Sequence, residues 1–277
     1  MEELRGKTAV VTGGASGIGK ALAARCCAEG MNVVLADVEE AALAGTRAEL
    51  EQGGRKVVSV VTDVSQPRAV EELARRTLDA FGSVELLFNN AGVGAGTTIW
   101  ESTLEDWTWV IGVNLWGVIN GIRTFVPLML KQNRPAQIVN TASIAGLVKG
   151  HHSAPYGVTK HAVVALTEQL ALELERVRAP IRASVLCPSW VNTRINESWR
   201  NRPASLLNKA GTESPPTPEM LKRWEELQEF VRRATPPSEI ADVVFEEGVR
   251  QGKLYIIPHK ETALYIRNRF EGIMRDV

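Results

Sequence analysis

The sequence predicts an α/β fold built on one doubly wound, seven-stranded parallel sheet with helices on both faces. Short runs rich in valine, isoleucine and leucine alternate with helical segments along most of the chain, which is typical of a parallel sheet. These runs are apolar at nearly every position, as expected for strands buried on both faces. A glycine-rich segment follows the first run directly and marks a turn from a strand into a helix.

The individual elements are read from composition and from helix start and stop signals. Strands are predicted at the β-branched runs 7–12, 32–36, 56–61, 84–88, 137–141, 181–186 and 254–257. Helices are predicted at 18–29, 40–52, 67–80, 104–131 and 156–178. Gly30 is placed to end the first helix, and Pro67 to begin the third at its favoured first-turn position. The whole chain, 1–277, is expected to form a single domain.

Two segments do not follow the strand–helix alternation. The segment 194–235 is rich in proline, has no strand-like run and contains one amphipathic stretch at 219–233. A long insertion after a strand is usually a functional cover or a disordered loop. The cover is favoured by apolar residues in and just before it, which are Trp190, Ile195, Trp199, Leu206, Leu207, Met220 and Trp224.

The tail 261–277 reads as an amphipathic helix with an apolar stripe of Ala263, Ile266, Phe270 and Ile273. It is either a lid on the chain's own pocket or a contact to a neighbouring subunit, and the subunit contact is favoured.

Composition excludes several classes of protein. Lys+Arg and Asp+Glu both number 32, so the net charge is zero, which argues against a nucleic-acid partner bound through a generally basic surface. We expect no membrane span, because no uninterrupted apolar run of about 18 residues is seen. Cys26, Cys27 and Cys187 show no disulfide pattern, which favours a reducing, cytoplasmic compartment. The four histidines lack metal-ligand spacing, so no metal site is expected.

The glycine-rich segment predicts a nucleotide site. Gly13 permits a tight turn, Gly17 lets a phosphate approach backbone amides, and Gly19 permits close packing of helix on strand. Ser16 and Ile18 lie in the same loop, at the positive end of the following helix, which attracts a pyrophosphate. The alternative is a glycine turn in an unrelated α/β protein.

Asp37 ends the second strand, where the ribose of a bound dinucleotide is expected. Its carboxylate can accept both ribose hydroxyl protons. It would repel a 2′-phosphate by about 4 kcal/mol per pair of unit charges at roughly 4 Å and an effective dielectric of about 20. NAD is therefore predicted over NADP. The alternative is that Asp37 only caps a helix.

Further candidate cofactor residues follow the third and fourth strands. Asp63 is expected to hold the adenine amino group, with Val64 beside it. Asn90, Ala91 and Gly92 are expected to lie against the cofactor. Each of these sets, taken alone, is equally compatible with turn chemistry.

The candidate catalytic residues lie in the second half of the sheet. Tyr156 and Lys160 are four residues apart and share one face of a helix. A lysine beside a phenol lowers the phenol's pKa and favours tyrosinate. Ser143 follows the fifth strand and can hydrogen-bond a substrate oxygen, and Asn114 is expected to hold a water through its main chain. A Tyr/Lys pair with this spacing, taken alone, is usually a solvent-exposed pair without a function.

Taken together, these motifs resemble the short-chain dehydrogenase/reductase family. The resemblance rests on residues that occur in the family's order between 7 and 193, namely TGGASGIG at 12–19, Asp37, Asp63, NNAG at 89–92, Asn114, Ser143 and YGVTK at 156–160. It implies a Rossmann-type domain in which Tyr156 is the general acid/base and Lys160 tunes it and holds the nicotinamide ribose. Ser143 would polarise the carbonyl and Asn114 would anchor a proton-relay water. A homotetramer or homodimer is also implied.

One motif departs from the family pattern. After the sixth strand the family often has Pro-Gly, and here Ser189 follows Pro188. Contacts of Pro188, Val191 and Thr193 to the nicotinamide are still expected. Weaker candidates for the substrate pocket are Ile144, His152 and Trp190.

Three arginines in the insertion, Arg194, Arg200 and Arg202, either attract an acidic group or form an exposed charged loop.

The predicted function is an NAD-dependent oxidoreductase that interconverts a hydrophobic secondary alcohol and its ketone by hydride transfer. Two alternatives remain: an NAD-binding redox sensor without turnover, and a dehydratase or epimerase of the same family. The second usually carries a longer carboxyl-terminal domain, and the first has no need of a proton donor such as Tyr156.

Overall fold

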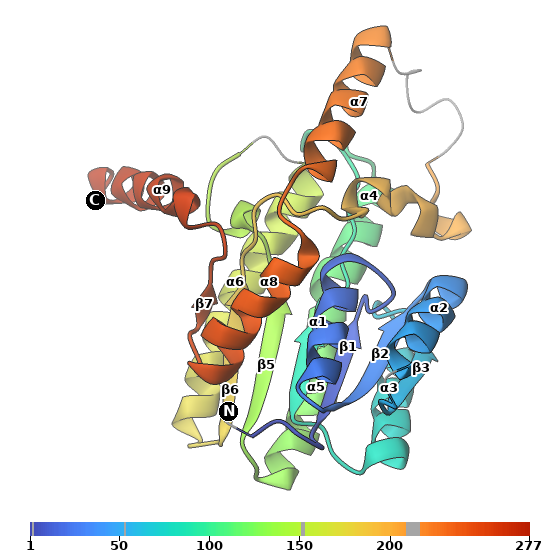
Figure 1. Cartoon of the computed structure of the whole chain (residues 1–277). Coiled ribbons are helices and arrows are strands. Elements are labelled where there is room, and N and C mark those ends of the chain that lie inside the picture. Colours follow the sequence, from blue (N-terminus) through green and yellow to red (C-terminus); the bar gives the residue numbers. More distant parts are fainter. Residues whose placement is uncertain (2, 53, 151–152, 209–216) are drawn as a thin grey trace.

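The computed structural model describes residues 1, 3–52, 54–150, 153–208 and 217–277. Its centre is one seven-stranded parallel sheet (Figure 1) with the strand order β3-β2-β1-β4-β5-β6-β7. The predicted fold class is confirmed. The strands are β1 (Thr8–Thr12), β2 (Asn32–Asp37), β3 (Val57–Val61), β4 (Leu86–Asn89), β5 (Ala136–Thr141), β6 (Ile181–Leu186) and β7 (Tyr255–Ile256).

Helices cover both faces of the sheet. They are α1 (Gly17–Ala28), α2 (Glu40–Glu51), α3 (Pro67–Phe81), α4 (Leu104–Ile111), α5 (Gly117–Gln132), α6 (Ala154–Arg176), α7 (Pro218–Arg232), α8 (Pro237–Val243) and α9 (Ala263–Arg275). Successive strand residues point to opposite faces: Ala9 and Val11 pack with α1 and α8, and Val10 packs with α3, α5 and α6. Because all the strands run parallel, the polar residues that follow them gather at one edge of the sheet.

The predicted helix at 104–131 is not continuous. A π-helical segment, Gly112–Trp116, separates α4 from α5 and carries Asn114. A π-helical bulge inside a helix often marks a functional position. By length and composition the run Leu104–Gln132 meets the criterion for a membrane span, which the sequence analysis did not anticipate. Its buried side chains, including Phe125 and Met129, pack in the core between the sheet and the helices.

The helix α8 and the π-helical segment after it, Val244–Arg250, were not predicted. Pro236 and Pro237 suggest a loop, but Pro237 lies at the first turn of a helix, where proline is tolerated. Helix α8 buries Ile240, and the π-helical segment buries Phe245, against α1 and the sheet, and Figure 1 shows α8 beside α1. The segment is thus part of the main core and not of the cover.

The remaining helices that were predicted, at 156–178, 219–233 and 261–277, are present with bounds shifted by one or two residues. α6 ends at Arg176, because Arg178 adopts a left-handed backbone conformation with φ 53°. The predicted helix at 219–233 is α7, which projects from the body of the protein in Figure 1. The tail forms α9, which also extends outwards and has no buried residue.

Candidate active site

The predicted cofactor and catalytic residues lie along one cavity of about 1590 Å³ at the carboxyl ends of the strands. This is where ligands bind in open parallel sheets. Among the predicted residues, the cavity is lined by Gly13, Ser16, Gly17, Ile18, Asp37, Asp63, Val64, Asn90, Ala91, Gly92, Ser143, Tyr156, Lys160, Pro188, Val191 and Thr193. Gly19 and Asn114 support the cavity from behind.

The glycine loop fits a group that approaches its backbone closely. A Cβ atom on Gly19 would lie 2.0 Å from the carbonyl oxygen of Gly13, so only glycine permits this packing of α1 on β1. Gly17 has φ +52°, and a Cβ there would lie 3.0 Å from Thr193 Cγ2, which also lines the cavity. Backbone amides at the start of α1 are therefore left accessible to an anionic group. These residues fit the pyrophosphate of a dinucleotide.

Asp37 links the end of β2 to the glycine loop. Its Oδ2 accepts a hydrogen bond from Ala15 N at 3.0 Å, and its Oδ1 accepts one from Glu39 N at 3.1 Å. Burial raises the pKa of the Asp37 carboxyl, and the two backbone hydrogen bonds oppose that shift. The residue that caps α2 is Glu39, so Asp37 is not the helix cap that the alternative interpretation required.

The loops after β3 and β4 are held by side-chain hydrogen bonds. Thr12 Oγ1 accepts hydrogen bonds from Asn90 N at 2.9 Å and Ala91 N at 3.1 Å, which fixes the loop after β4 against β1. Asp63 Oδ1 accepts hydrogen bonds from Ser65 N at 2.9 Å and Ser65 Oγ at 2.7 Å. These residues have the turn chemistry that the sequence allowed, and they also line the cavity.

Ser143, Tyr156 and Lys160 come together at the centre of the cavity. Lys160 Nζ donates a hydrogen bond to the carbonyl oxygen of Thr141 at 2.8 Å and lies 5.4 Å from the centre of the Tyr156 ring. The side chain of Ser143 lies near enough to that of Tyr156 to lower its pKa through hydrogen bonding. The three groups from β5 and α6 can therefore act on one bound oxygen.

Asn114 supports this group from the π-helical segment. Its side chain is fully buried, accepts a hydrogen bond from Val93 N at 2.8 Å and donates to Val93 O at 2.9 Å. Its Nδ2 also donates to Thr159 Oγ1 at 3.2 Å, next to Lys160 in the chain. Asn114 thus ties the loop after β4 to α6.

Burial controls the titration of the central residues. It lowers the pKa of the Lys160 ammonium to about 8, because an ion in an apolar interior loses hydration. Burial also raises the pKa of Tyr156, although the hydrogen bond with Ser143 acts in the opposite direction. Lys160 is not among the causes of this shift, so the expected lowering of the phenol's pKa by Lys160 is not seen in this structure.

The other end of the cavity is aromatic and apolar. Trp190 lines it and packs edge-on against Phe230, with ring centres 5.5 Å apart. Ile144 and several cover residues also line it, namely Ile195, Leu206 and Trp224, whereas Trp199 and Leu207 are exposed outside it. His152 and the side chain of Met220 lie outside the described residues.

Sequence reasoning missed residues on α4 and near the carboxyl end of the chain. Leu104, Trp107 and Trp109 line the cavity, and their aromatic spacing before Asn114 was the available signal. His259 was also missed: its Nδ1 accepts a hydrogen bond from Ser189 N at 3.0 Å. His259 therefore fixes the backbone at the position where the family pattern has glycine.

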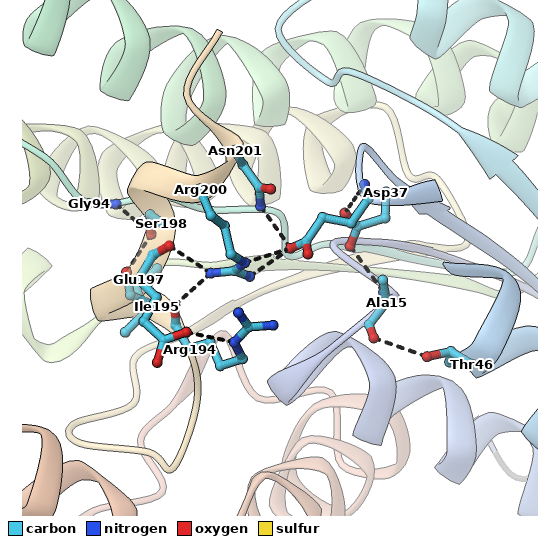
Figure 2. Close-up of polar contacts among 11 residues, drawn as sticks. Ala15, Asp37, Thr46, Gly94, Arg194, Ile195, Glu197, Ser198, Arg200 and Asn201 are labelled. Atoms are coloured by element: carbon cyan, nitrogen blue, oxygen red, sulfur yellow. Dashed lines mark hydrogen bonds and ion pairs between the residues drawn. The ribbon is translucent and has the colours of Figure 1, made fainter. Parts of the chain in front are cut away.

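Each of the three arginines singled out in the insertion pairs with a carboxylate, and only Arg194 is exposed. Arg194 pairs with Glu197 at 2.8 Å, Arg200 with Glu39 at 2.7 Å, and Arg202 with Asp106 at 2.7 Å. The Arg202–Asp106 pair is the most buried of the three, with side chains 9% and 7% exposed. Figure 2 shows Arg200 and Asn201 directed towards the region of Asp37.

The chain matches the family model for short chain dehydrogenases over residues 7–204. It is 31% identical over 277 residues to a CLA biosynthesis dehydrogenase/reductase of Lactiplantibacillus plantarum, covering 100% of this chain and 96% of that protein. It is 34% identical over 275 residues to a 1-deoxy-11-beta-hydroxypentalenate dehydrogenase of Streptomyces arenae, covering 98% and 89%. A solved short chain dehydrogenase/reductase from Burkholderia phymatum, in complex with NAD, has TM-score 0.93 and 44% identity, covering 100% and 97%.

The fold and the cavity define a Rossmann-type oxidoreductase that acts on alcohol or ketone groups. The chain belongs to the short-chain dehydrogenase/reductase family.

Proposed function

We propose that the protein is an NAD(H)-dependent dehydrogenase that interconverts a hydrophobic secondary alcohol and its ketone, with Ser143, Tyr156, Lys160 and Asn114 as its catalytic set. The observation that carries this proposal is the meeting of Ser143, Tyr156 and Lys160 in the cavity that the glycine loop also lines. The NAD complex of the Burkholderia phymatum relative supports the choice of cofactor.

The residues that we propose to bind the cofactor lie along the length of the cavity. Ser16, Gly17 and Ile18 would hold the pyrophosphate, and Asp37 the adenosine ribose. Asp63 and Val64 would contact the adenine, while Gly13, Asn90, Ala91, Gly92, Pro188, Val191 and Thr193 would complete the contacts, with Gly19 packed beneath the loop. A half-buried carboxylate at the ribose position favours NAD over NADP.

The mechanism follows from where each side chain can exchange a proton. In oxidation, Tyr156 as tyrosinate accepts the proton of the alcohol, and Ser143 donates a hydrogen bond to the substrate oxygen as it becomes a carbonyl. Lys160 would hold the nicotinamide ribose, and it places its ammonium by the Tyr156 ring. NAD⁺, when bound, supplies the hydride acceptor and a positive charge that favours tyrosinate. Asn114 anchors the end of the proton path behind Lys160.

The lining of the cavity supports an apolar substrate. Trp107, Trp109, Trp190 and Leu206 contribute aromatic and aliphatic surface, with Ile144 beside Ser143. Arg194, Arg200 and Arg202 are each ion-paired and so do not favour an acidic substrate.

We further propose a homotetramer or homodimer in the cytoplasm. The exposed apolar side chains of α9, among them Tyr265, Phe270 and Met274, support a subunit contact. No described residue of α9 lines the cavity, so the contact is favoured over a lid. The three cysteines are free and buried, which suits a reducing compartment.

An absorbance screen tests the function. NADH formation is followed over secondary alcohols from small aliphatic to aryl and polycyclic, with NAD and NADP compared. Turnover with NAD is expected. Tyr156→Phe should bind NADH normally but lose activity by roughly a hundredfold or more, the usual contribution of a general acid or base. NADH binding without turnover for any alcohol would instead favour a redox sensor, and full activity of Tyr156→Phe would refute its role.

A further inference from the structure

A short segment of the cover, Ile195–Asn201, crosses the cofactor cleft. It follows β6, on the substrate side of the sheet, and yet its last residues contact the loop after β2. In the sheet β2 and β6 are separated by β1, β4 and β5, so residues 187–201, from the end of β6 to Asn201, bridge four strand spacings of about 4.8 Å, or roughly 19 Å. A bound dinucleotide would extend along the same direction, from Asp37 towards Tyr156.

The segment Ile195–Asn201 ends in a contact with the charged side chain of Glu39, which lies two residues after Asp37. Glu39 Oε1 accepts hydrogen bonds from Arg200 Nη2 at 2.7 Å, Arg200 Nε at 3.0 Å and Asn201 Nδ2 at 2.8 Å. The Arg200 and Glu39 side chains are only 18% and 23% exposed. Hydrogen bonds from Arg200 lower the pKa of the Glu39 carboxyl, so it is charged at neutral pH. Glu39, Arg200 and Asn201 all line the cavity that contains Asp37.

Arg200 is held in place by its own segment. Its Nη1 donates to the carbonyl oxygens of Arg194 at 3.1 Å and Glu197 at 2.9 Å, which leaves Nε and Nη2 directed at Glu39. Figure 2 shows these bonds around Arg200. A guanidinium oriented in this way loses less side-chain entropy when it binds a carboxylate.

The cover does not depend on Glu39 for its attachment. Arg202 binds the buried carboxylate of Asp106 on α4, and Ser198 Oγ accepts a hydrogen bond from Gly94 N at 3.2 Å. Both contacts lie towards the substrate end of the cleft. Among the hydrogen bonds of the described residues, those with Glu39 join the cover to the adenosine end, so this contact can open while the cover stays attached elsewhere.

We propose that Glu39 and Arg200 form a latch that closes the adenosine end of the cleft, and that opening of this latch limits release of the dinucleotide. The inference rests on the proposed function, because it requires that the cleft bind NAD(H). Glu39 acts here through Arg200 and is a positioning residue, distinct from Asp37, which is expected to contact the ribose.

The test measures release of NADH directly. Wild-type protein loaded with NADH is mixed with excess NAD in a stopped-flow instrument, and the decay of bound NADH fluorescence gives the release rate. Glu39→Gln keeps the shape of the side chain but removes its charge, and we expect release to be roughly tenfold faster, equivalent to about 1.4 kcal/mol. Because salt screens a partly exposed ion pair, added salt should accelerate release from the wild type and have little effect on Glu39→Gln.

Two further variants support the interpretation. Asn201→Leu removes one of the three hydrogen bonds to Glu39 and should accelerate release by a smaller factor, roughly threefold. Glu49→Gln is the matched control: Glu49 pairs with Lys20 between α2 and α1 at 2.6 Å and does not touch the cover. Its release rate should equal that of the wild type.

The outcomes separate the latch from the function on which it rests. If the wild type shows no NADH signal, the proposed function fails and the latch with it. If NADH binds but Glu39→Gln and Asn201→Leu release it at the wild-type rate, only the latch is overturned. A lower thermal midpoint for Glu39→Gln with unchanged release would make the contact a structural tie and also overturn the latch.

Discussion

Replacing Lys160 with methionine should stabilise the fold near neutral pH while it removes activity. Lys160 is 3% exposed, and burial lowers its pKa from 10.5 to about 8. A fall of this size corresponds to roughly 3 kcal/mol of differential stability between its two protonation states. The ammonium also donates to Thr141 O at 2.8 Å, and loss of that bond costs about 1–2 kcal/mol. A net gain of about 1–2 kcal/mol at pH 7 is expected for Lys160→Met.

The pH dependence follows from proton binding. Between about pH 8 and 10.5 the unfolded chain keeps a proton on Lys160 that the folded protein has lost. Wild-type stability therefore rises with pH through this window. The destabilisation from Lys160 is fully present below about pH 8 and absent above about pH 10.5. The advantage of Lys160→Met should accordingly shrink as the pH rises from 7 to 10.

Urea unfolding of both proteins at several pH values measures this difference. Lys56→Met, which replaces an exposed lysine, is the control and should change stability by less than about 0.5 kcal/mol at every pH. The reasoning would be refuted if Lys160→Met were no more stable than the wild type at pH 7, or if its advantage were independent of pH.

Three further predictions concern the cofactor, the cover and the tail. Asp37→Asn should lower the ratio of kcat/KM with NAD to that with NADP by roughly tenfold or more, because a neutral amide does not repel a 2′-phosphate; an unchanged ratio would contradict this. Arg202→Met should lower the free energy of unfolding in urea by about 3 kcal/mol, since it leaves the Asp106 carboxylate buried without its cation. Adding Asp106→Asn should recover part of that loss, and strictly additive effects would argue against the pair. Deletion of 261–277 should reduce the mass measured by light scattering, and an unchanged oligomer would exclude the tail as a subunit contact.

The sheet and the position of the site could be predicted because their signals are local. Buried parallel strands are continuous apolar runs, and the predicted strand at 181–186 coincides with β6. The glycine loop could be predicted because its residues are neighbours in the chain. Since all strands run parallel, the polar residues after them had to gather at one edge, which is where Asp37, Ser143 and Tyr156 line the cavity.

The missed features depend on packing or on distant partners. The π-helical segment around Asn114 inserts into a run whose apolar pattern is helical throughout. Two adjacent prolines suggested a loop where helix α8 begins, although the buried residues Ile240 and Val244 have helical spacing. The contact between Glu39 and Arg200 joins residues 161 positions apart, and no pattern within either segment indicates the other.

Three of the attachments of the cover also imply an order of folding. They join residues separated by 104 positions at Ser198, 161 at Arg200 and 96 at Arg202, whereas adjacent strands such as β1 and β2 join through one short helix. Closing a longer loop costs more conformational entropy, and contacts between distant residues therefore form more slowly. Each partner of the cover also lies in a loop or helix that follows a strand of the finished sheet. We therefore expect the cover to dock after the core has formed, so that a newly made chain would pass through a stage in which the sheet is complete while its binding cleft is open to solvent and proteases.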